Sequence, residues 1–411
     1  MRITLLSCLA CTSLVAVTAC GTATDVKDSS AAHLEAAGVQ MSEPVTDLGY
    51  DDITDGNRQL GYDLATAIPT DDGNLIFSPA SLSIAFAMLR EGAVGATAEE
   101  IDRVLHLPPD RQKVYNGLLH QLHDVGAGDV LELNNALFLD ESLEVKPEFL
   151  EALKTWYGAG VELADFPDPA LDQINGWVED KTNGRIPQLL DQLDPLAVFA
   201  LVNTVYLNAK WEQPFDPDDT QDDSFTTAAG AEVSVPTMHA STTYDYAETS
   251  TWQAVRQPYQ GGELSMVVLL PKDDTDPVEL LKTDALAAAD RGFSSTEVEL
   301  ALPKWDMETT AELTGILRTL GMDDTFGGRG DFSALTSDPS FAVTQVLQRA
   351  NITVGEEGTE AAAATVIVGE AMAAAPPQGA VAFVADHPFA FAIVHGPTGV
   401  PLFEGVVDDP S

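Results

Sequence analysis

Hydrophobic and polar positions alternate between helical and strand-like spacing along this chain. Leucine and isoleucine recur at helical spacing over 60–68, and an apolar helix face follows Ser78, a serine N-cap with proline behind it. The apolar run over 199–207 predicts a strand buried on both faces. Two runs at 389–395 and 400–407, joined by Gly-Pro-Thr-Gly, predict a hairpin. The pattern predicts a mixed domain of helices and strands.

Two further helix starts are marked by polar residues. Asp168-Pro169 precedes an apolar helix face, and Thr97-Ala-Glu-Glu100 has the form of a capping box. The first pattern predicts a helix that begins at Asp168, and the second predicts a helix that begins at Thr97. Sustained apolar periodicity is missing before about Asp51, so ordered structure is expected to begin there.

Residues 354–377 have a different pattern, V-G-E-E-G-T-E-A-A-A-A-T-V-I-V-G-E-A-M-A-A-A-P-P. Side chains alternate in a strand, so Thr359 and every second residue after it would form one face, and nearly all of that face is small. Such a strand can enter between two existing strands and pair with both. Outside a sheet it would be an exposed, cleavable loop. Composition alone also fits an alanine-rich helix or a low-complexity linker.

The amino terminus has the form of an export signal. Arg2 precedes an apolar stretch over 3–19, and Val-Thr-Ala leads into Cys20. This sequence resembles a bacterial lipobox, in which Cys20 is lipid-modified and becomes the first mature residue. An ordinary signal peptide that contains cysteines is the alternative. Because only Cys20 would remain in the mature chain, no internal disulfide is expected.

The chain is strongly acidic, with 20 basic and 65 acidic side chains and a formal net charge of −45. Such a surface repels nucleic acid and anionic membrane surfaces. No basic cluster is present that would recruit a glycosaminoglycan activator. The excess of carboxylates is also typical of salt-adapted proteins, although it serves ordinary solubility as well.

Several motifs together resemble the serpins, the family of serine protease inhibitors. G-E-E-G-T-E-A-A-A-A-T at 355–365 is similar to the hinge of the serpin reactive-centre loop. N-L-I-F-S-P-A-S-L-S at 74–83 and V-N-T-V-Y-L-N-A-K-W-E-Q-P-F at 202–215 match two further serpin motifs. D-H-P-F at 386–389 and L-F-E-G at 402–405 complete the family's carboxyl-terminal signature.

The resemblance covers about residues 51–410 and implies a single serpin domain of α+β class. It implies three β-sheets, about nine helices and an exposed reactive-centre loop. The expected organisation is a lipoprotein signal peptide over 1–19, a flexible tether over 20–50 and the serpin domain over 51–411.

By the same resemblance, a target protease attacks the loop as a substrate and forms an acyl-enzyme. The loop then inserts into the main sheet before deacylation. Counting from the hinge glycine, Gly358, places the scissile bond between Met372 and Ala373, and the segment from Thr359 to Met372 would span about 46 Å as a strand. The implied hinge comprises Glu357, Gly358, Thr359, Glu360, Ala361, Ala362, Ala363 and Ala364.

Met372 suits chymotrypsin-, subtilisin- or elastase-like pockets and does not suit a trypsin-like pocket, whose carboxylate would remain unpaired. The neighbouring alanines leave a one-residue shift of the scissile bond open. Cysteine proteases also form acyl-enzymes and stay a possible target class.

Two structural clusters are carried over from the family. Ser78, Ser81 and Asn203 match the shutter, which keeps the main sheet closed, and Trp211 matches the breach, where the loop enters. One departure concerns the usual shutter histidine, whose position falls on Gln348. Glutamine donates and accepts hydrogen bonds as histidine does, but it does not titrate near neutral pH.

Catalytic motifs are absent from the sequence. It contains no G-x-S-x-G, no H-E-x-x-H, no phosphate-binding glycine loop and no paired-cysteine spacing. His120 and His123 are three apart on an expected helix, but no further ligands accompany them. We therefore expect a protein that is not an enzyme and that has no metal or cofactor. Together with the resemblances above, this predicts a monomeric inhibitor outside the cytoplasm, either anchored by lipid to a bacterial envelope or secreted. A non-inhibitory serpin that acts as a binding or chaperone-like module is the alternative.

Overall fold

The structure is a computed structural model. It describes residues 31–45, 48–69, 73–123, 125, 130–182, 184, 186–272, 275–281, 283–339, 341–359 and 379–411. Within these ranges no helix combines the length and the apolar character that crossing a membrane requires.

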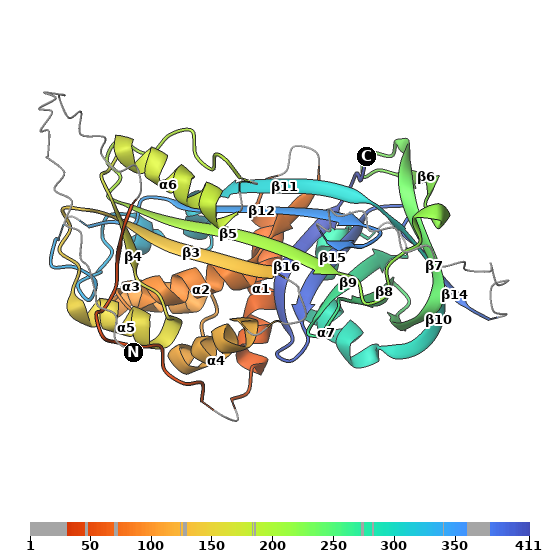
Figure 1. Ribbon diagram of the computed structural model, residues 1–411, viewed down its shortest axis with the longest axis horizontal. Coiled ribbons are helices and arrows are strands. Elements are labelled where there is room, and N and C mark those ends of the chain that lie inside the picture. Colours follow the sequence, from red (N-terminus) through yellow and green to blue (C-terminus); the bar gives the residue numbers. More distant parts are fainter. Residues whose placement is uncertain are drawn as a thin grey trace, which may run out of the picture.

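Nine α-helices lie in the described ranges, and α1 to α5 gather on one side of the long sheet (Figure 1). The helices are α1 (Asp51–Ala67), α2 (Pro79–Arg90), α3 (Gly95–Val104), α4 (Arg111–His123), α5 (Pro147–Tyr157), α6 (Asp168–Lys181), α7 (Thr283–Gly292), α8 (Thr314–Thr319) and α9 (Asp323–Phe326). Two short 3-10 helices are η1 (Pro217–Asp219) and η2 (Pro277–Leu281).

Two of the predicted helix starts have different outcomes. The Ser78 hydroxyl caps α2 by accepting the backbone N–H of Ser81 at 3.1 Å, as predicted. The capping box at Thr97 is wrong, because α3 already begins at Gly95. Thr97 instead accepts the backbone N–H of Asp331, which is remote in the sequence. The Thr97 hydroxyl therefore binds the backbone of a distant loop and does not cap the helix.

Seven strands form the sheet that carries the candidate site. Their order is β1 (Ala32–Leu34), β4 (Val161–Ala164), β3 (Val130–Asp140), β5 (Phe199–Lys210), β13 (Gly358–Thr359), β12 (Val346–Gly355) and β11 (Trp305–Glu312). Below β13, β12 and β5 pair directly and in parallel from Val346↔Leu201 to Ala350↔Val205. β12 and β5 are therefore held apart at their other end, where β13 lies between them.

The nine-stranded sheet supports the other half of the molecule. Its order is β14 (Val381–Val384), β10 (Ser294–Pro303), β7 (Glu232–Glu248), β8 (Trp252–Pro258), β9 (Leu264–Pro271), β15 (Phe389–His395), β16 (Val400–Val407) and β2 (Leu75–Phe77), with β6 (Gln221–Thr226) paired to β7. The predicted hairpin is confirmed as β15 and β16.

The resemblance implied three β-sheets, whereas the described residues form two hydrogen-bonded sheets. The reason is β7, whose 17 residues are continuous. β7 pairs with β6 and β10 along most of its length and with β8 at its end. One long strand thus joins two sheets that the resemblance counted separately, while the α+β serpin architecture itself is confirmed.

β5, in the middle of the seven-stranded sheet, is buried on both faces, as the apolar run over 199–207 predicted. On one face, α6 packs Ile174 and Val178 against Phe138 and Val202. The opposite face packs onto α2 and the nine-stranded sheet in the main core. The first nine residues of β5 are all buried, so a polar residue within this run must find a partner inside the protein.

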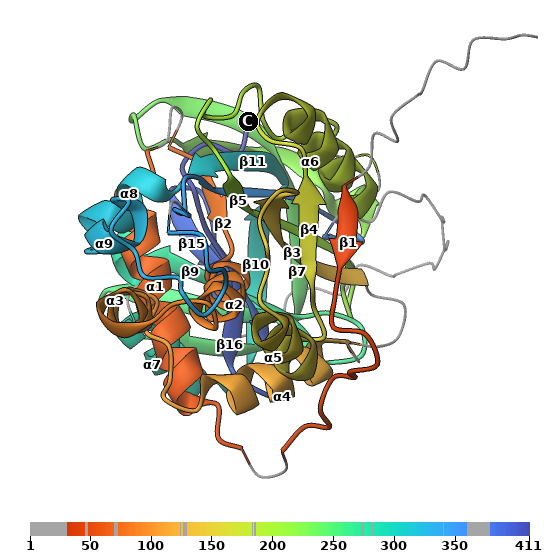
Figure 2. The same cartoon turned by 90° about the vertical axis from the view of Figure 1, so that its left-hand side faces the viewer.

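Residues 31–50 differ from the expected tether wherever they are described. β1 pairs antiparallel with the outer edge of β4 (Figure 2). Further along, the backbone N–H of Ser42 donates to the Thr155 carbonyl at 2.8 Å, and the Ser42 carbonyl accepts Asn116 Nδ2 at 3.1 Å. The tether prediction is wrong for this segment, because β4 offers an unpaired strand edge. Residues 20–30 of the predicted tether lie outside the described residues.

Candidate functional site

The hinge of the predicted loop already occupies a place in the seven-stranded sheet. β13, which consists of Gly358 and Thr359, lies between β12 and β5 and is antiparallel to both. Thr359 is opposite Val354 on one side and Ala209 on the other. Two residues of the hinge are therefore inserted before any cleavage.

Glycine is required at position 358 by close approach. An added Cβ would lie 2.1 Å from the carbonyl oxygen of Ala209 and 2.7 Å from the Cα of Lys210. A φ of +155° is a further obstacle to an L side chain. Any larger residue would push the hinge away from β5, so the hinge glycine fixes where the chain enters the sheet.

Ion pairs hold the turn that precedes the hinge. Glu356 lies 2.9 Å from Lys304 Nζ and accepts the Thr220 hydroxyl at 3.0 Å. Burial would raise the pKa of Glu356, but the hydrogen bonds from Lys304, the backbone and Thr220 outweigh burial and keep that pKa below its ordinary value. The Glu357 carboxylate is 3.8 Å from Lys210 Nζ, and its carbonyl accepts the backbone N–H of Trp211 at 2.9 Å.

Trp211, the residue predicted for the breach, lies beside the hinge. Its side chain has no exposed surface, and its Nε1 donates to the carbonyl of Gly355 at 2.9 Å. The indole stacks on Tyr259 with ring centroids 4.4 Å apart and an interplanar angle of 16°. The indole therefore joins the end of β12 to the segment that follows β8.

The predicted shutter residues meet beneath the seven-stranded sheet. Gln348 Oε1 accepts the backbone N–H of Ser78 at 2.9 Å, and its Nε2 donates to the Ser78 carbonyl at 2.9 Å and to Asn203 Oδ1 at 2.8 Å. The Asn203 amide in turn donates to Ser81 Oγ and Asn135 Oδ1. These bonds tie β12, β5 and β3 to the start of α2. Gln348 thus fills both hydrogen-bonding roles with a group that has no charge to gain or lose.

Asn135 and Tyr259 were not among the predicted site residues. Asn135 interrupts the apolar strand L-E-L-N-N-A-L-F-L, and a polar residue in such a run signals a buried partner. No sequence pattern around Tyr259 indicates its contact with the hinge, because that contact joins two segments 100 residues apart.

Several predicted positions lie outside the described residues. These are Glu360 and Ala361 to Ala364 of the hinge, the scissile pair Met372 and Ala373, and Cys20. The described part of the hinge comprises Glu357, Gly358 and Thr359.

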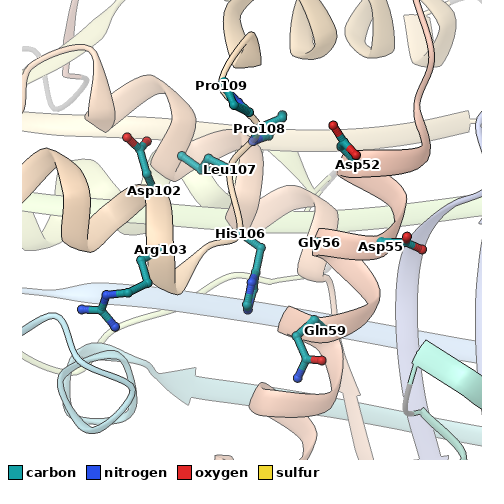
Figure 3. Close-up of a pocket in the computed structure, with 10 residues that line it drawn as sticks. All are labelled: Asp52, Asp55, Gly56, Gln59, Asp102, Arg103, His106, Leu107, Pro108 and Pro109. Atoms are coloured by element: carbon teal, nitrogen blue, oxygen red, sulfur yellow. The ribbon is translucent and has the colours of Figure 1, made fainter.

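A cavity of about 470 Å³ lies away from the hinge, between α1 and residues 102–109 (Figure 3). Charged residues line much of it, including Asp52, Asp55 and Arg103. Over the ranges that the structure describes, no group of three or more His, Cys, Asp or Glu side chains is arranged to hold a metal ion. His120 contacts the Ser42 carbonyl through Nε2 at 2.8 Å.

A family model described as Serpin (serine protease inhibitor) matches residues 55–410. The chain belongs to the serpin family. Among its relatives is an uncharacterized serpin-like protein of Thermococcus kodakarensis, 35% identical over 87% of this chain and 86% of the relative. Leukocyte elastase inhibitor A of Rattus norvegicus is 32% identical over 86% of this serpin and 97% of the relative.

Solved structures agree with this assignment. The crystal structure of the thermophilic serpin tengpin in the native state superposes with a TM-score of 0.83 and 27% identity, covering 92% of this serpin and all of tengpin. Since the family model is described as serine protease inhibitor and one relative is named as an elastase inhibitor, protease inhibition is the general class of function that these similarities support.

Proposed function

We propose that this serpin is a suicide-substrate inhibitor of extracellular serine proteases. The loop that follows Thr359 would be cut between Met372 and Ala373 and would then enter the gap between β5 and β12. The observation that carries this proposal is β13, which already lies in that gap and pairs with both strands.

The register of β13 predicts how insertion would proceed. Continued along both neighbours, it brings residue 363 between Ala350 and Val205, the first pair that now joins β12 directly to β5. Two residues later it brings Thr365 between Gln348 and Asn203. The shutter hydrogen bond between those two side chains would then have to open. Insertion beyond residue 362 therefore requires the sheet to separate.

New backbone hydrogen bonds would drive this separation. Each contributes about 0.5–1.5 kcal/mol net. A dozen of them would supply roughly 10 kcal/mol, which is comparable to the stability of a whole protein. The uncut protein would thus be metastable with respect to the inserted form.

The chemistry would belong to the protease. Its serine oxygen attacks the carbonyl carbon of Met372, the bond to the Ala373 nitrogen breaks, and Ala373 leaves as a new amino terminus. Insertion before hydrolysis of the Met372 ester would leave the two proteins covalently joined. An unbranched apolar side chain at this position favours chymotrypsin-, subtilisin- or elastase-like targets.

The proposed site of action is the bacterial envelope. The sequence around Cys20 supports lipid attachment there, since small residues precede the cysteine and an apolar stretch precedes them. In this setting the serpin would protect the envelope from secreted proteases.

The proposal is tested by mixing the soluble chain, residues 21–411, with subtilisin, chymotrypsin and pancreatic elastase. Denaturing electrophoresis should show a covalent complex with at least one protease, and intact mass should identify a released peptide that begins at Ala373. Cleavage of the loop by all three proteases without any complex, and without a gain in heat stability of the cut protein, would contradict the proposal.

A further inference from the structure

Two buried hydroxyl groups meet at the hinge. The Tyr259 hydroxyl and Thr359 Oγ1 lie 2.6 Å apart. Tyr259 has no exposed surface and Thr359 is 1% exposed, so water does not compete for either group. Among the described residues, Thr359 Oγ1 has no other hydrogen-bond partner. The pair therefore satisfies a hydroxyl that would otherwise be buried without a partner.

The Tyr259 ring is held by contacts other than its hydroxyl bond to Thr359. It stacks on Trp211, and its backbone N–H donates to the Leu264 carbonyl at 3.0 Å. Tyr259 directly follows β8, a strand of the nine-stranded sheet. Tyr259 also forms an isolated β-bridge with Trp211, the residue after β5. The hydroxyl is thus presented from the segment that connects the nine-stranded sheet to the end of β5.

We propose that Tyr259 is the positioning residue that holds the uncut loop at an insertion of two residues. Its hydroxyl keeps Thr359 between β5 and β12, and this seat is the starting point from which the cut loop enters the sheet. The inference rests on the proposed function for its effect on inhibition. The seating itself is a property of the free protein.

The seat matters because insertion competes with hydrolysis of the acyl-enzyme. With Thr359 in place, the hinge already pairs with Val354 and Ala209. No direct pair between β12 and β5 is met until the register reaches Ala350 and Val205. A seated hinge therefore begins insertion without the cost of entering the sheet, and a larger share of the protease is trapped.

A double-variant cycle in the full chain tests the hydroxyl pair. Tyr259→Phe keeps the aromatic stack but leaves the Thr359 hydroxyl without this partner. Thr359→Val keeps a β-branched side chain but leaves the Tyr259 hydroxyl without its threonine. Each single variant should raise amide hydrogen exchange over residues 356–359 by about tenfold, the size expected for one buried hydroxyl that loses its bond. The variant with both substitutions should return close to wild-type exchange, because neither hydroxyl then remains.

Inhibition gives the second readout. Each single variant should consume more inhibitor per trapped protease molecule, and the double variant should regain the wild-type ratio. Tyr244→Phe, on β7 in the nine-stranded sheet, is the matched control and should change neither readout.

The inference is overturned if Tyr259→Phe leaves exchange over 356–359 unchanged, or if the double variant is no better than the single ones. Failure of the proposed function is recognised separately. In that case no protease is trapped by any variant, while the hydrogen-exchange cycle still reports on the seat.

Discussion

Glu404, on β16, is a carboxyl group without exposed surface. Neither of its carboxylate oxygens has a hydrogen-bond partner among the described residues. The group packs against Gly61 of α1, where an added Cβ would lie only 1.9 Å from Oε2. Burial raises the pKa of Glu404 well above its ordinary value, and the charge of Arg58 offsets this only in part. Arg58 is itself bound to Asp290 at 2.5 Å.

Replacing this carboxyl group gives a prediction at the scale of one residue. Because the folded state holds the Glu404 proton more tightly than the unfolded state does, its contribution to stability is complete below the unfolded pKa. That contribution is lost as pH rises toward the folded pKa. Glu404→Gln should therefore match the wild type near pH 4 and be more stable by roughly 1–3 kcal/mol at pH 8. Thermal unfolding followed from pH 4 to 9 measures the difference.

The control for this experiment is Glu232→Gln, an exposed carboxylate at the start of β7. It should leave the pH dependence of unfolding as in the wild type. If Glu404→Gln and the wild type lose stability in parallel as pH rises, Glu404 is not the group responsible.

At the scale of elements, the hinge strand accepts only small, uncharged side chains on its inner face. Thr359→Arg would place a guanidinium between β5 and β12 without a partner, at a cost that exceeds a few kcal/mol. The variant should be cleaved as a substrate, with the amount of inhibitor consumed per trapped protease rising more than about tenfold. Titration of residual protease activity measures this ratio.

Glu360→Arg is the matched variant, because alternation along a strand assigns residue 360 to the opposite face. It should retain inhibition. A Thr359→Arg protein that traps protease as well as the wild type would remove the basis for strand insertion.

The amino-terminal strand gives a second prediction at this scale. An added Cβ on Gly160 would lie 2.4 Å from the Leu34 carbonyl oxygen. Gly160→Ala should therefore push β1 off β4 at a cost of about 1–3 kcal/mol and expose residues 31–45 to limited proteolysis. Gly176→Ala, whose Cβ would meet no atom within 4 Å, is the control and should be cut no faster than the wild type. Equal cleavage of both variants would show that β1 does not depend on this contact.

For the whole molecule, the ordered amino-terminal segment would limit the distance to a lipid anchor on Cys20. Only eleven residues separate Cys20 from Ala32, where β1 begins, and they span at most about 40 Å. β4 and α5 lie at one end of the molecule and β14, which follows the loop, lies at the other (Figure 1). An anchor on Cys20 would thus hold the end opposite β14 nearest the membrane.

The anchor is tested by fractionating cells that produce the full chain. Wild-type protein should sediment with the membranes, whereas Cys20→Ser should be soluble with unchanged inhibition, because the substitution leaves the hinge and shutter residues as they are. Recovery of all wild-type protein in the soluble fraction would rule out the lipid anchor.

The sequence alone determined those features that depend on neighbouring residues. The continuous apolar run identified β5, the Ser78-Pro79 pair identified the start of α2, and the two runs around Gly-Pro-Thr-Gly identified the terminal hairpin. Each signal is local, because strand burial, helix capping and tight turns are set by side chains a few positions apart. The serpin motifs added the family and the positions of its shutter and breach.

Only the tertiary structure decided which distant groups meet. It seated Gly358 and Thr359 against β5, brought Asn135 into the shutter, placed Tyr259 on the hinge and paired β1 with β4. The capping box predicted at Thr97 was wrong for the same reason, since the Thr97 hydroxyl binds the backbone of Asp331, more than 200 residues away in the sequence. Buried polar groups and open strand edges take whatever partner the folded chain brings within reach, and no local pattern encodes that choice.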